Sequence, residues 1–301
     1  MAGRNGLDRI WNSAFALLIL TGALLGLILP FGKIAAQNGV PPLLWTFIFS
    51  FGAACILALA LALRGHRFSL TGRLLRYYLI AAAISYAIPN FLIFTVMPHL
   101  GAGYTGIMYT LSPALTLLMS ITLGISRPNA LGIAGITVGF IGAVMVATTR
   151  GELGSPSEPF WVALALLIPV LLAAGNIYRT YDWPGGADPV ELAVGSHFAS
   201  ALMLMAAMLL QGGVSFSPLA AVPLITLAQI LASAAMFAFY FRLQAVGGPV
   251  YLSQIGYVGA GVGLLSGTML LGERYQMLTW AGAAVIVIGV ALTTRAQAKV
   301  S

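Results

Sequence analysis

The chain has 301 residues, of which 60% are hydrophobic and only 7% are charged. About ten apolar stretches are long enough to span a membrane, for which about 20 mostly apolar residues are needed, and only short loops separate them. This composition excludes a soluble domain of any size. The formal net charge of +7 does not indicate a nucleic-acid partner, because the basic residues gather beside the ends of the apolar stretches, as membrane orientation requires.

The predicted fold class is an all-α membrane protein with ten transmembrane helices in one integrated membrane domain. In chain order the predicted spans cover residues 13–37, 43–63, 74–97, 101–125, 130–148, 160–181, 190–211, 219–243, 248–271 and 276–294. The first apolar run is too long for the hydrophobic core of a signal peptide, so it is interpreted as the first span. The single cysteine, Cys55, lies inside the second span and excludes a disulfide within the chain.

The basic residues predict that both termini face the cytoplasm. Lys33, Arg150 and Arg274 fall toward the outside when the N-terminus is placed inside and the spans alternate. The remaining Lys and Arg residues fall on or near the inside, namely Arg4, Arg9, Arg64, Arg67, Arg73, Arg76, Arg127, Arg179, Arg242, Arg295 and Lys299.

An internal repeat is indicated when the chain is shifted against itself by about 147 residues. The coinciding pairs include Gly101 with Gly248, Tyr104 with Tyr251, Arg127 with Arg274, Gly135 with Gly282, and Gly142 with Gly289. The sequence therefore predicts two halves, residues 1–150 and 151–301, of five spans each. Because five is odd, the halves enter the membrane from opposite sides, which is the inverted repeat common among secondary transporters.

Two segments resemble the drug/metabolite transporter superfamily. Residues 101–115, GAGYTGIMYTLSPAL, resemble the region leading into its fourth span, and Leu271-Gly272-Glu273, followed by Gly282 and Gly289-Val290, resembles the ending of an EamA-type repeat. Within the superfamily the chain is most similar to the YddG group of exporters. That resemblance implies a multi-pass protein of the bacterial inner membrane that exports aromatic and other neutral amino acids, related metabolites and some cationic drugs.

Polar side chains inside spans are costly, so each needs a partner or a function. Tyrosines can stack on an aromatic substrate while donating a hydrogen bond, and they can hold a cation over the ring. Amide side chains offer both a donor and an acceptor, which suits a zwitterion. The alternatives are anchoring at the membrane interface for tyrosines and hydrogen bonding between helices for amides. The candidate substrate-binding residues are Tyr86, Asn90, Tyr109, Asn176, His197, Tyr240, Gln254 and Tyr257.

Helix breaks inside spans are candidate gating positions, because proline removes a helical hydrogen bond and exposed backbone at membrane depth needs a protein or water partner. Pro89, Pro113 and Pro169 are such breaks, and the pairs Pro89-Asn90 and Ser112-Pro113 point toward an interior pathway. Gly259 and Gly263 form a smooth helix face that suits either sliding or close packing of a neighbouring helix. An ordinary capped kink is the alternative at each proline.

All seven acidic residues lie outside the predicted spans or at their edges. A membrane pump usually keeps an interior carboxylate, and small multidrug antiporters that resemble half of this fold depend on a membrane Glu. Glu273 is not expected to be a shared requirement, because Ser126 stands at its position in the first half. We therefore expect uncoupled, facilitated transport by alternating access. Proton coupling is the alternative, with His197 as the titratable group inside a span.

Lys33 and Arg179 are related by a shift of about 146 residues, and both are expected to snorkel to opposite membrane interfaces. Lys33 could instead meet a substrate carboxylate at the outer mouth. A membrane-embedded enzyme, a channel and a lipid flippase are further alternatives. The separate histidines and the lack of HExxH, CxxC or a phosphate-binding loop indicate no enzyme, no metal and no cofactor. The expected partners are a small-molecule substrate and the bilayer, and two fused halves make a monomer sufficient without forbidding a dimer.

Overall fold

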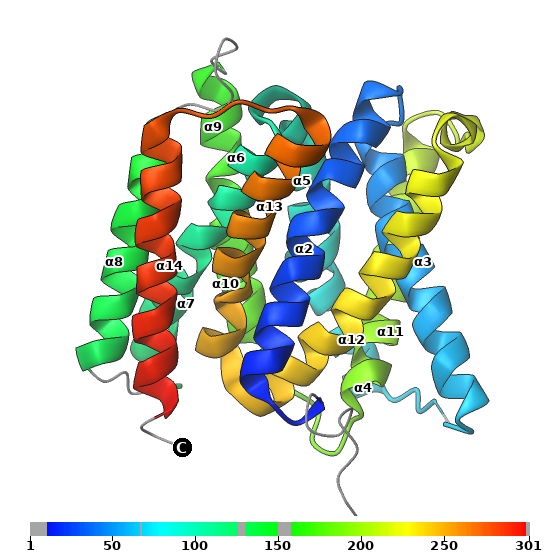
Figure 1. The fold of residues 1–301 in the computed structure, drawn as a ribbon. Helices are drawn as coiled ribbons and strands as arrows, with labels where there is room; N and C mark the ends of the chain where they lie inside the picture. The colour runs from blue at the N-terminus through cyan, green and yellow to red at the C-terminus, as the bar shows by residue number, and fades with distance from the viewer. Residues whose placement is uncertain (1–10, 67, 126–129, 150–157, 299–301) are drawn as a thin grey trace, which may run out of the picture.

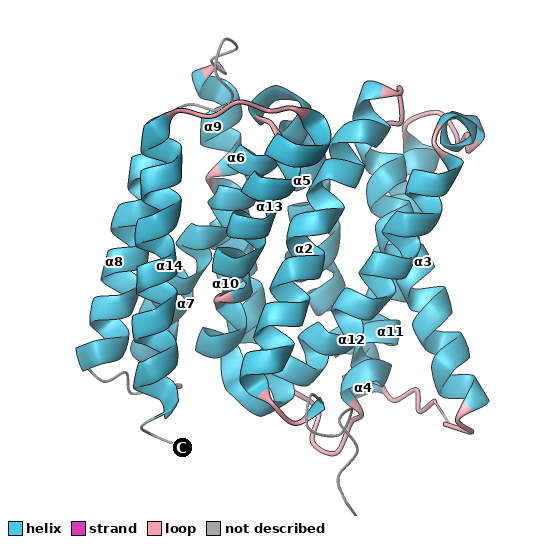
Figure 2. Ribbon diagram, viewed as in Figure 1, coloured by secondary structure: helices cyan, strands magenta, loops and turns pink. Residues whose placement is uncertain are grey.

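The computed structural model describes residues 11–66, 68–125, 130–149 and 158–298. Across these ranges the chain forms helices joined by loops, and it contains no strand there (Figure 2). The main helices are α2 (Ala14–Gln37), α3 (Pro42–Leu63), α4 (Gly72–Ala81), α5 (Ile88–Leu100), α6 (Ala102–Met108), α7 (Ser112–Thr122), α8 (Ala130–Ala147), α9 (Pro159–Ala165), α10 (Leu167–Tyr181), α11 (Pro189–Leu210), α12 (Pro223–Ser253), α13 (Ile255–Leu271) and α14 (Met277–Ala298).

Seven helical segments are long and apolar enough to cross a membrane by length and composition, and three shorter apolar helices accompany them. The seven are Ala14–Gln37, Pro42–Leu63, Gly72–Leu100, Ala102–Thr122, Pro159–Tyr181, Pro189–Leu210 and Pro223–Ser253, and the shorter ones are Ala130–Val146, Ile255–Leu271 and Met277–Thr293. Large apolar side chains such as Leu59, Leu63 and Leu202 are exposed, as a lipid environment requires. The all-helical prediction is confirmed for the described residues, whereas the ten-span, two-repeat arrangement stays a prediction.

Helix starts follow local sequence signals. Ser13 caps α2 by accepting a hydrogen bond from the Ala16 N–H at 3.2 Å, and the Thr71 hydroxyl caps α4 in the same way. Asp188 caps α11, where its Oδ1 accepts from the Val190 N–H at 2.7 Å. Pro42 begins α3 at a position where its missing N–H costs nothing. These caps explain why predicted span starts lie close to the observed ones.

The predicted proline breaks fall at irregular points of the helices. A π-helical turn, Ala82–Ala87, precedes Pro89, and a 3₁₀ turn, Tyr109–Leu111, precedes Pro113. The boundary between α9 and α10 at Leu166 lies just before Pro169. Each irregularity is expected where a proline cannot donate the next helical hydrogen bond.

A kink at Gly248, whose φ is +71° and whose ψ is −178°, divides α12 into two helices and coincides with the predicted start of the ninth span at residue 248. Gly101, between α5 and α6, has a similar conformation with φ +86° and ψ 155°. Glycine is required at both points because a side chain strains a positive φ.

Glycine lets pairs of helices approach closely. The paired helices α8 and α14 lie side by side (Figure 1). A methyl group added at Gly142 would lie 2.6 Å from the carbonyl oxygen of Gly282, and one added at Gly135 would lie 2.8 Å from that of Gly289. Small residues at a helix contact allow this backbone approach in lipid.

The helix α2 packs against both α12 and α13. The face predicted from Gly259 and Gly263 is the one that meets α2, where Gly22 and Gly26 supply the opposing backbone. The structure therefore gives these glycines a packing contact, and their role in gating stays a prediction. This arrangement brings helices from distant parts of the chain together around a central cavity.

Candidate functional site

The central cavity lies among helices that come from residues 14–122 and from residues 167–271. It leaves about 40 Å³ for the centres of water molecules, which is room for a few waters. Its lining is aromatic, apolar and neutral-polar, without an acidic or basic side chain. The lining residues are Leu25, Phe49, Ser85, Tyr86, Asn90, Tyr109, Ser112, Leu172, Asn176, Met236, Phe237, Tyr240, Ser253, Ile255 and Gly256.

Five predicted substrate-binding residues meet at this cavity. They are Tyr86, Asn90, Tyr109, Asn176 and Tyr240. The helix breaks explain why several of them point inward. The irregular turns before Pro89 and Pro113 contain Tyr86 and Tyr109, and polar groups gather where regular helix is interrupted.

The wall at Tyr109 depends on a close backbone contact. A methyl group added at Gly256 would lie 2.5 Å from the Tyr109 carbonyl oxygen. Ser112 follows Tyr109 by one helical turn, and its side chain is buried in the same lining. Ser253 lies three residues before Gly256 and donates its hydroxyl to the Val250 carbonyl at 2.7 Å. Neutral oxygen atoms therefore cluster where α7, α12 and α13 meet.

His197 stands behind the cavity wall. Its ring centroid lies 3.7 Å from that of Phe237 and 4.3 Å from that of Tyr86, and both of those aromatic side chains line the cavity. His197 is fully buried, and neither ring nitrogen has a hydrogen-bond partner among the described residues. His197 is not part of the lining in this conformation, its ring packs against the aromatic wall, and its contact with the substrate stays a prediction.

Two further predicted residues lie away from the cavity lining. Tyr257 is directed toward α8, because a methyl group added at Gly139 would lie 2.6 Å from the Tyr257 hydroxyl oxygen. Gln254 is fully buried at the break between α12 and α13 and is not part of the lining. The helix α13 is apolar on all sides, so its sequence carries little information about which face points inward.

A buried cation adjoins the cavity at Arg179 in α10. Arg179 has 1% of its surface exposed. Its Nε donates to Gln244 Oε1 at 2.8 Å, and its Nη2 donates to Asn176 Oδ1 at 2.8 Å and to the Tyr240 hydroxyl. The guanidinium carbon also lies 5.4 Å from the Tyr86 ring centroid. The predicted snorkelling of Arg179 to an interface was wrong, since these neutral groups hold it inside the protein.

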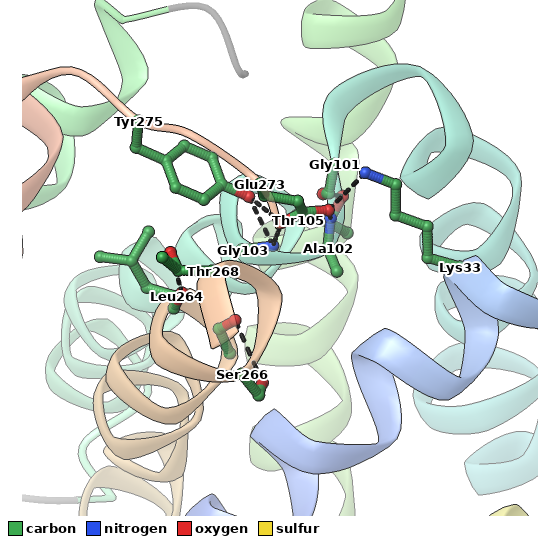
Figure 3. Close-up of polar contacts among 11 residues, drawn as sticks. Lys33, Gly101, Ala102, Gly103, Thr105, Leu264, Ser266, Thr268, Glu273 and Tyr275 are labelled. Atoms are coloured by element: carbon green, nitrogen blue, oxygen red, sulfur yellow. Dashed lines mark hydrogen bonds and ion pairs between the residues drawn. The ribbon is translucent and has the colours of Figure 1, made fainter. Parts of the chain in front are cut away.

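The second cation, Lys33 in α2, lies in a different cluster (Figure 3). Lys33 Nζ donates to Glu273 Oε1 at 2.5 Å, and the Lys33 side chain is 10% exposed whereas that of Glu273 is fully buried. The predicted snorkelling of Lys33 was also wrong, because a buried ion pair holds the ammonium. The alternative of a substrate carboxylate at Lys33 stays untested, and in this conformation Glu273 occupies that position.

Glu273 also caps the start of α6. Its Oε1 accepts from the Ala102 N–H at 2.9 Å, its Oε2 accepts from the Gly103 N–H at 3.3 Å, and Tyr275 donates its hydroxyl to Oε2. Burial raises the pKa of the Glu273 carboxyl, but the hydrogen bonds from Lys33, Tyr275 and Ala102 lower it more, and the pKa lies below its ordinary value. Glu273 therefore stays ionised at neutral pH. Its position at a span edge was predicted, whereas its burial was not.

The remaining described acidic residues have partners or positions elsewhere. Glu191 accepts from the Ser69 N–H at 3.0 Å and lies 3.0 Å from His66 Nε2. Asp182 binds Arg76 at 2.9 Å. The described residues contain no group of three or more His, Cys, Asp or Glu side chains that could hold a metal ion. The described acids thus leave the cavity and Arg179 without a carboxylate.

Several cavity residues were missed from the sequence. Phe237, Ser253 and Ser85 carry no motif, and their inward direction depends on helix rotation. Ser112 had a usable signal in its position before Pro113, where a break inside a span was expected to face an interior pathway.

Comparison with known proteins gives a family match for part of the chain and a fold match for nearly all of it. Residues 12–148 match the EamA-like transporter family. No curated protein matches the chain. The range that matches this family includes Lys33, Asn90 and Tyr109 and does not reach Arg179 or Glu273.

Solved structures share the fold. Of the 27 solved chains that match, one described only as the crystal structure of a protein has 18% sequence identity and a TM-score of 0.69. The alignment covers 92% of this chain and 98% of that chain. The fold described above is therefore present in another protein over nearly its whole length.

Proposed function

We propose that this protein is a multi-pass secondary transporter of the drug/metabolite transporter type. Its cargo is a neutral or zwitterionic amino acid, aromatic ones included, or a related small metabolite. The observation that carries the proposal is the central cavity, whose lining combines Tyr86, Tyr109 and Tyr240 with the amides of Asn90 and Asn176. Aromatic faces suit an apolar side chain, while amides and hydroxyls suit the ammonium and carboxylate groups of an amino acid.

Two features support alternating access by an inverted repeat. The kinks at Gly101 and Gly248 share a positive φ, and each starts a short helix beside the cavity. Contacts between α8 and α14 are reciprocal, because Gly135 meets Gly289 and Gly142 meets Gly282. Reciprocal contacts are what a two-fold relation between two halves produces. A cavity with room for only a few waters has to widen for an amino acid, as such a cycle requires.

Uncoupled, facilitated export is the transport mode that the lining favours. Among the described residues no carboxylate lines the cavity, so none of them offers an acidic group there to exchange a proton during transport. Efflux would then be driven by accumulation of the cargo in the cytoplasm, with both termini on the cytoplasmic side of a bacterial inner membrane. Proton-coupled antiport is the second candidate, because the titratable ring of His197 lies directly behind the wall and its two nitrogens have no hydrogen-bond partner among the described residues.

The test is transport of labelled L-phenylalanine by the full chain in liposomes. We expect saturable uptake along the substrate gradient without a pH gradient, and none in protein-free liposomes. Asn90→Ala should reduce the uptake, whereas Asn38→Ala, at an exposed helix end, should not. Non-saturable flux would indicate a channel. Uptake that needs an imposed pH gradient and is lost in His197→Gln would replace the uncoupled mode with the proton-coupled one.

A further inference from the structure

In the described part of the chain, the buried guanidinium of Arg179 donates hydrogen bonds to neutral groups alone. Its hydrogen-bond acceptors are the side-chain oxygens of Gln244, Asn176 and Tyr240. Among the described residues, none of the ion pairs includes Arg179. A charge taken out of water is costly unless an opposite charge compensates it, and inside a membrane that cost is higher still.

The groups around Arg179 connect it directly to the cavity. Asn176, Tyr240 and Tyr86 all contact the guanidinium, and all three line the cavity. The Tyr240 hydroxyl donates to Asn176 Oδ1 at 3.2 Å, so the same amide oxygen receives both Tyr240 and Arg179. One layer of side chains therefore separates the cation from the space that would hold the cargo.

We propose that Arg179 is the binding site for the carboxylate of the cargo, and that this carboxylate is the counter-charge that the described residues do not supply. The inference rests on the proposed function and narrows its substrate class to carboxylate-bearing molecules. The incoming carboxylate takes the place of Asn176 Oδ1 as acceptor of the Nη2 hydrogen bond, and Tyr240 then donates its hydroxyl to the same carboxylate. A guanidinium suits this role because its fixed donor pair matches a carboxylate.

The ammonium end of the cargo would contact a different part of the cavity wall from the carboxylate. Ser112, Ser253 and Asn90 provide neutral oxygens on the cavity wall, and the Tyr109 ring adds an aromatic face. These groups suit an ammonium without providing a full negative charge. The site therefore discriminates most strongly at the carboxylate, and an amine that lacks one should bind poorly.

Gln244→Glu tests this with little change of shape. It places a carboxylate where Gln244 Oε1 now accepts from Arg179 at 2.8 Å, and so supplies the missing counter-charge from within the chain. We expect binding of labelled L-phenylalanine to the purified protein to weaken by about tenfold to a hundredfold, as for the loss of a charged hydrogen bond. Arg179→Gln should weaken it similarly. Arg242→Gln, in the same helix as Gln244 but bound to Trp11 and Asn12, is the matched control and should leave binding unchanged.

Competition by two analogues separates this inference from the proposed function. In the wild-type protein, 3-phenylpropionate should compete with phenylalanine and phenethylamine should not, whereas in Gln244→Glu that preference should be lost. If phenylalanine binds equally well to the wild type and Gln244→Glu, and phenethylamine competes as well as 3-phenylpropionate, the role of Arg179 is overturned while amino-acid transport stands. If 3-phenylpropionate binds and phenylalanine does not, the carboxylate site stands and the amino-acid cargo is wrong. If the wild type binds neither, both are overturned.

Discussion

The Lys33 cluster and the Arg179 cluster both stabilise a buried cation, but with different kinds of hydrogen-bond partner. Each holds one buried cation, and the two cations lie 146 residues apart, close to the shift of about 147 residues in the predicted repeat. Lys33 is paired with Glu273, which in turn caps α6. Arg179 has the neutral oxygens of Asn176, Gln244 and Tyr240. In the Lys33 cluster a carboxylate of the chain balances the positive charge. In the Arg179 cluster the described residues leave the positive charge without a carboxylate beside the cavity.

This difference supports the proposed uncoupled mode of transport, because the buried carboxylate of Glu273 lies in the Lys33 cluster and not at the cavity. Glu273 has its oxygens occupied by an ammonium, two backbone N–H groups and a tyrosine hydroxyl. A carboxylate so fully bonded contributes to stability and holds helices together. A cation bonded only to neutral, displaceable groups is better suited to bind and release an anionic group. We therefore propose that the Lys33 cluster contributes to stability and the Arg179 cluster to substrate selectivity.

The largest expected effect is a loss of stability when the carboxylate of the Lys33 cluster is removed. Glu273→Ala removes the carboxylate that pairs with the buried Lys33 ammonium and accepts from the Ala102 N–H. Breaking a buried ion pair from one side costs about 3–5 kcal/mol, so the melting temperature of the detergent-solubilised protein should fall steeply. Glu158→Ala removes an exposed carboxylate that makes no capping hydrogen bond, and it should melt like the wild type. Equal melting temperatures for the two variants would contradict the structural role of Glu273.

A smaller effect is expected from crowding each cluster with one methyl group. In Gly267→Ala the new group would collide with the Glu273 carboxylate, and in Gly175→Ala it would collide with Ser85 and lie 3.2 Å from Arg179 Nη1. Overpacking costs about 1–3 kcal/mol. We expect Gly267→Ala to lower the melting temperature with little change in phenylalanine affinity, and Gly175→Ala to lower both.

The control for both substitutions is Gly261→Ala, whose added methyl group has nothing within 4 Å. It should leave stability and binding close to those of the wild type. If Gly175→Ala changed the melting temperature but not the affinity, the Arg179 cluster would be structural like its counterpart, and the contrast between the two clusters would fail.

The smallest effect is expected from lowering the pH, which changes the contribution of Glu273 to stability. The folded pKa of Glu273 lies below its ordinary value of 4.5, so its contribution to stability is complete above that value and is lost as the pH falls through the folded pKa. The difference in melting temperature between the wild type and Glu273→Gln should therefore be constant near neutral pH and shrink below about pH 4.5. A difference that instead grew on acidification would show that the carboxyl is protonated in the folded protein.

Much of the helix plan was predictable from the sequence because its signals are local. Apolar runs, the caps at Ser13 and Asp188 and the proline breaks each act within a few residues. The two clusters were not predictable in this way. Lys33 and Glu273 are 240 positions apart, and their contact depends on how the loop after α13 returns to α6. The sequence of a uniformly apolar helix also does not indicate which of its faces points to the cavity. For this reason Tyr257 was expected at the cavity and Phe237 was not.

The most direct test of the carboxylate site is transport by Gln244→Glu beside the wild type in liposomes. The quantity to measure is the initial rate of labelled L-phenylalanine uptake per folded molecule, at a concentration below half-saturation. The account predicts a saturable wild-type rate and a rate about tenfold or more lower in Gln244→Glu, with a melting temperature no lower than that of the wild type. Equal saturable rates in the two proteins would contradict it.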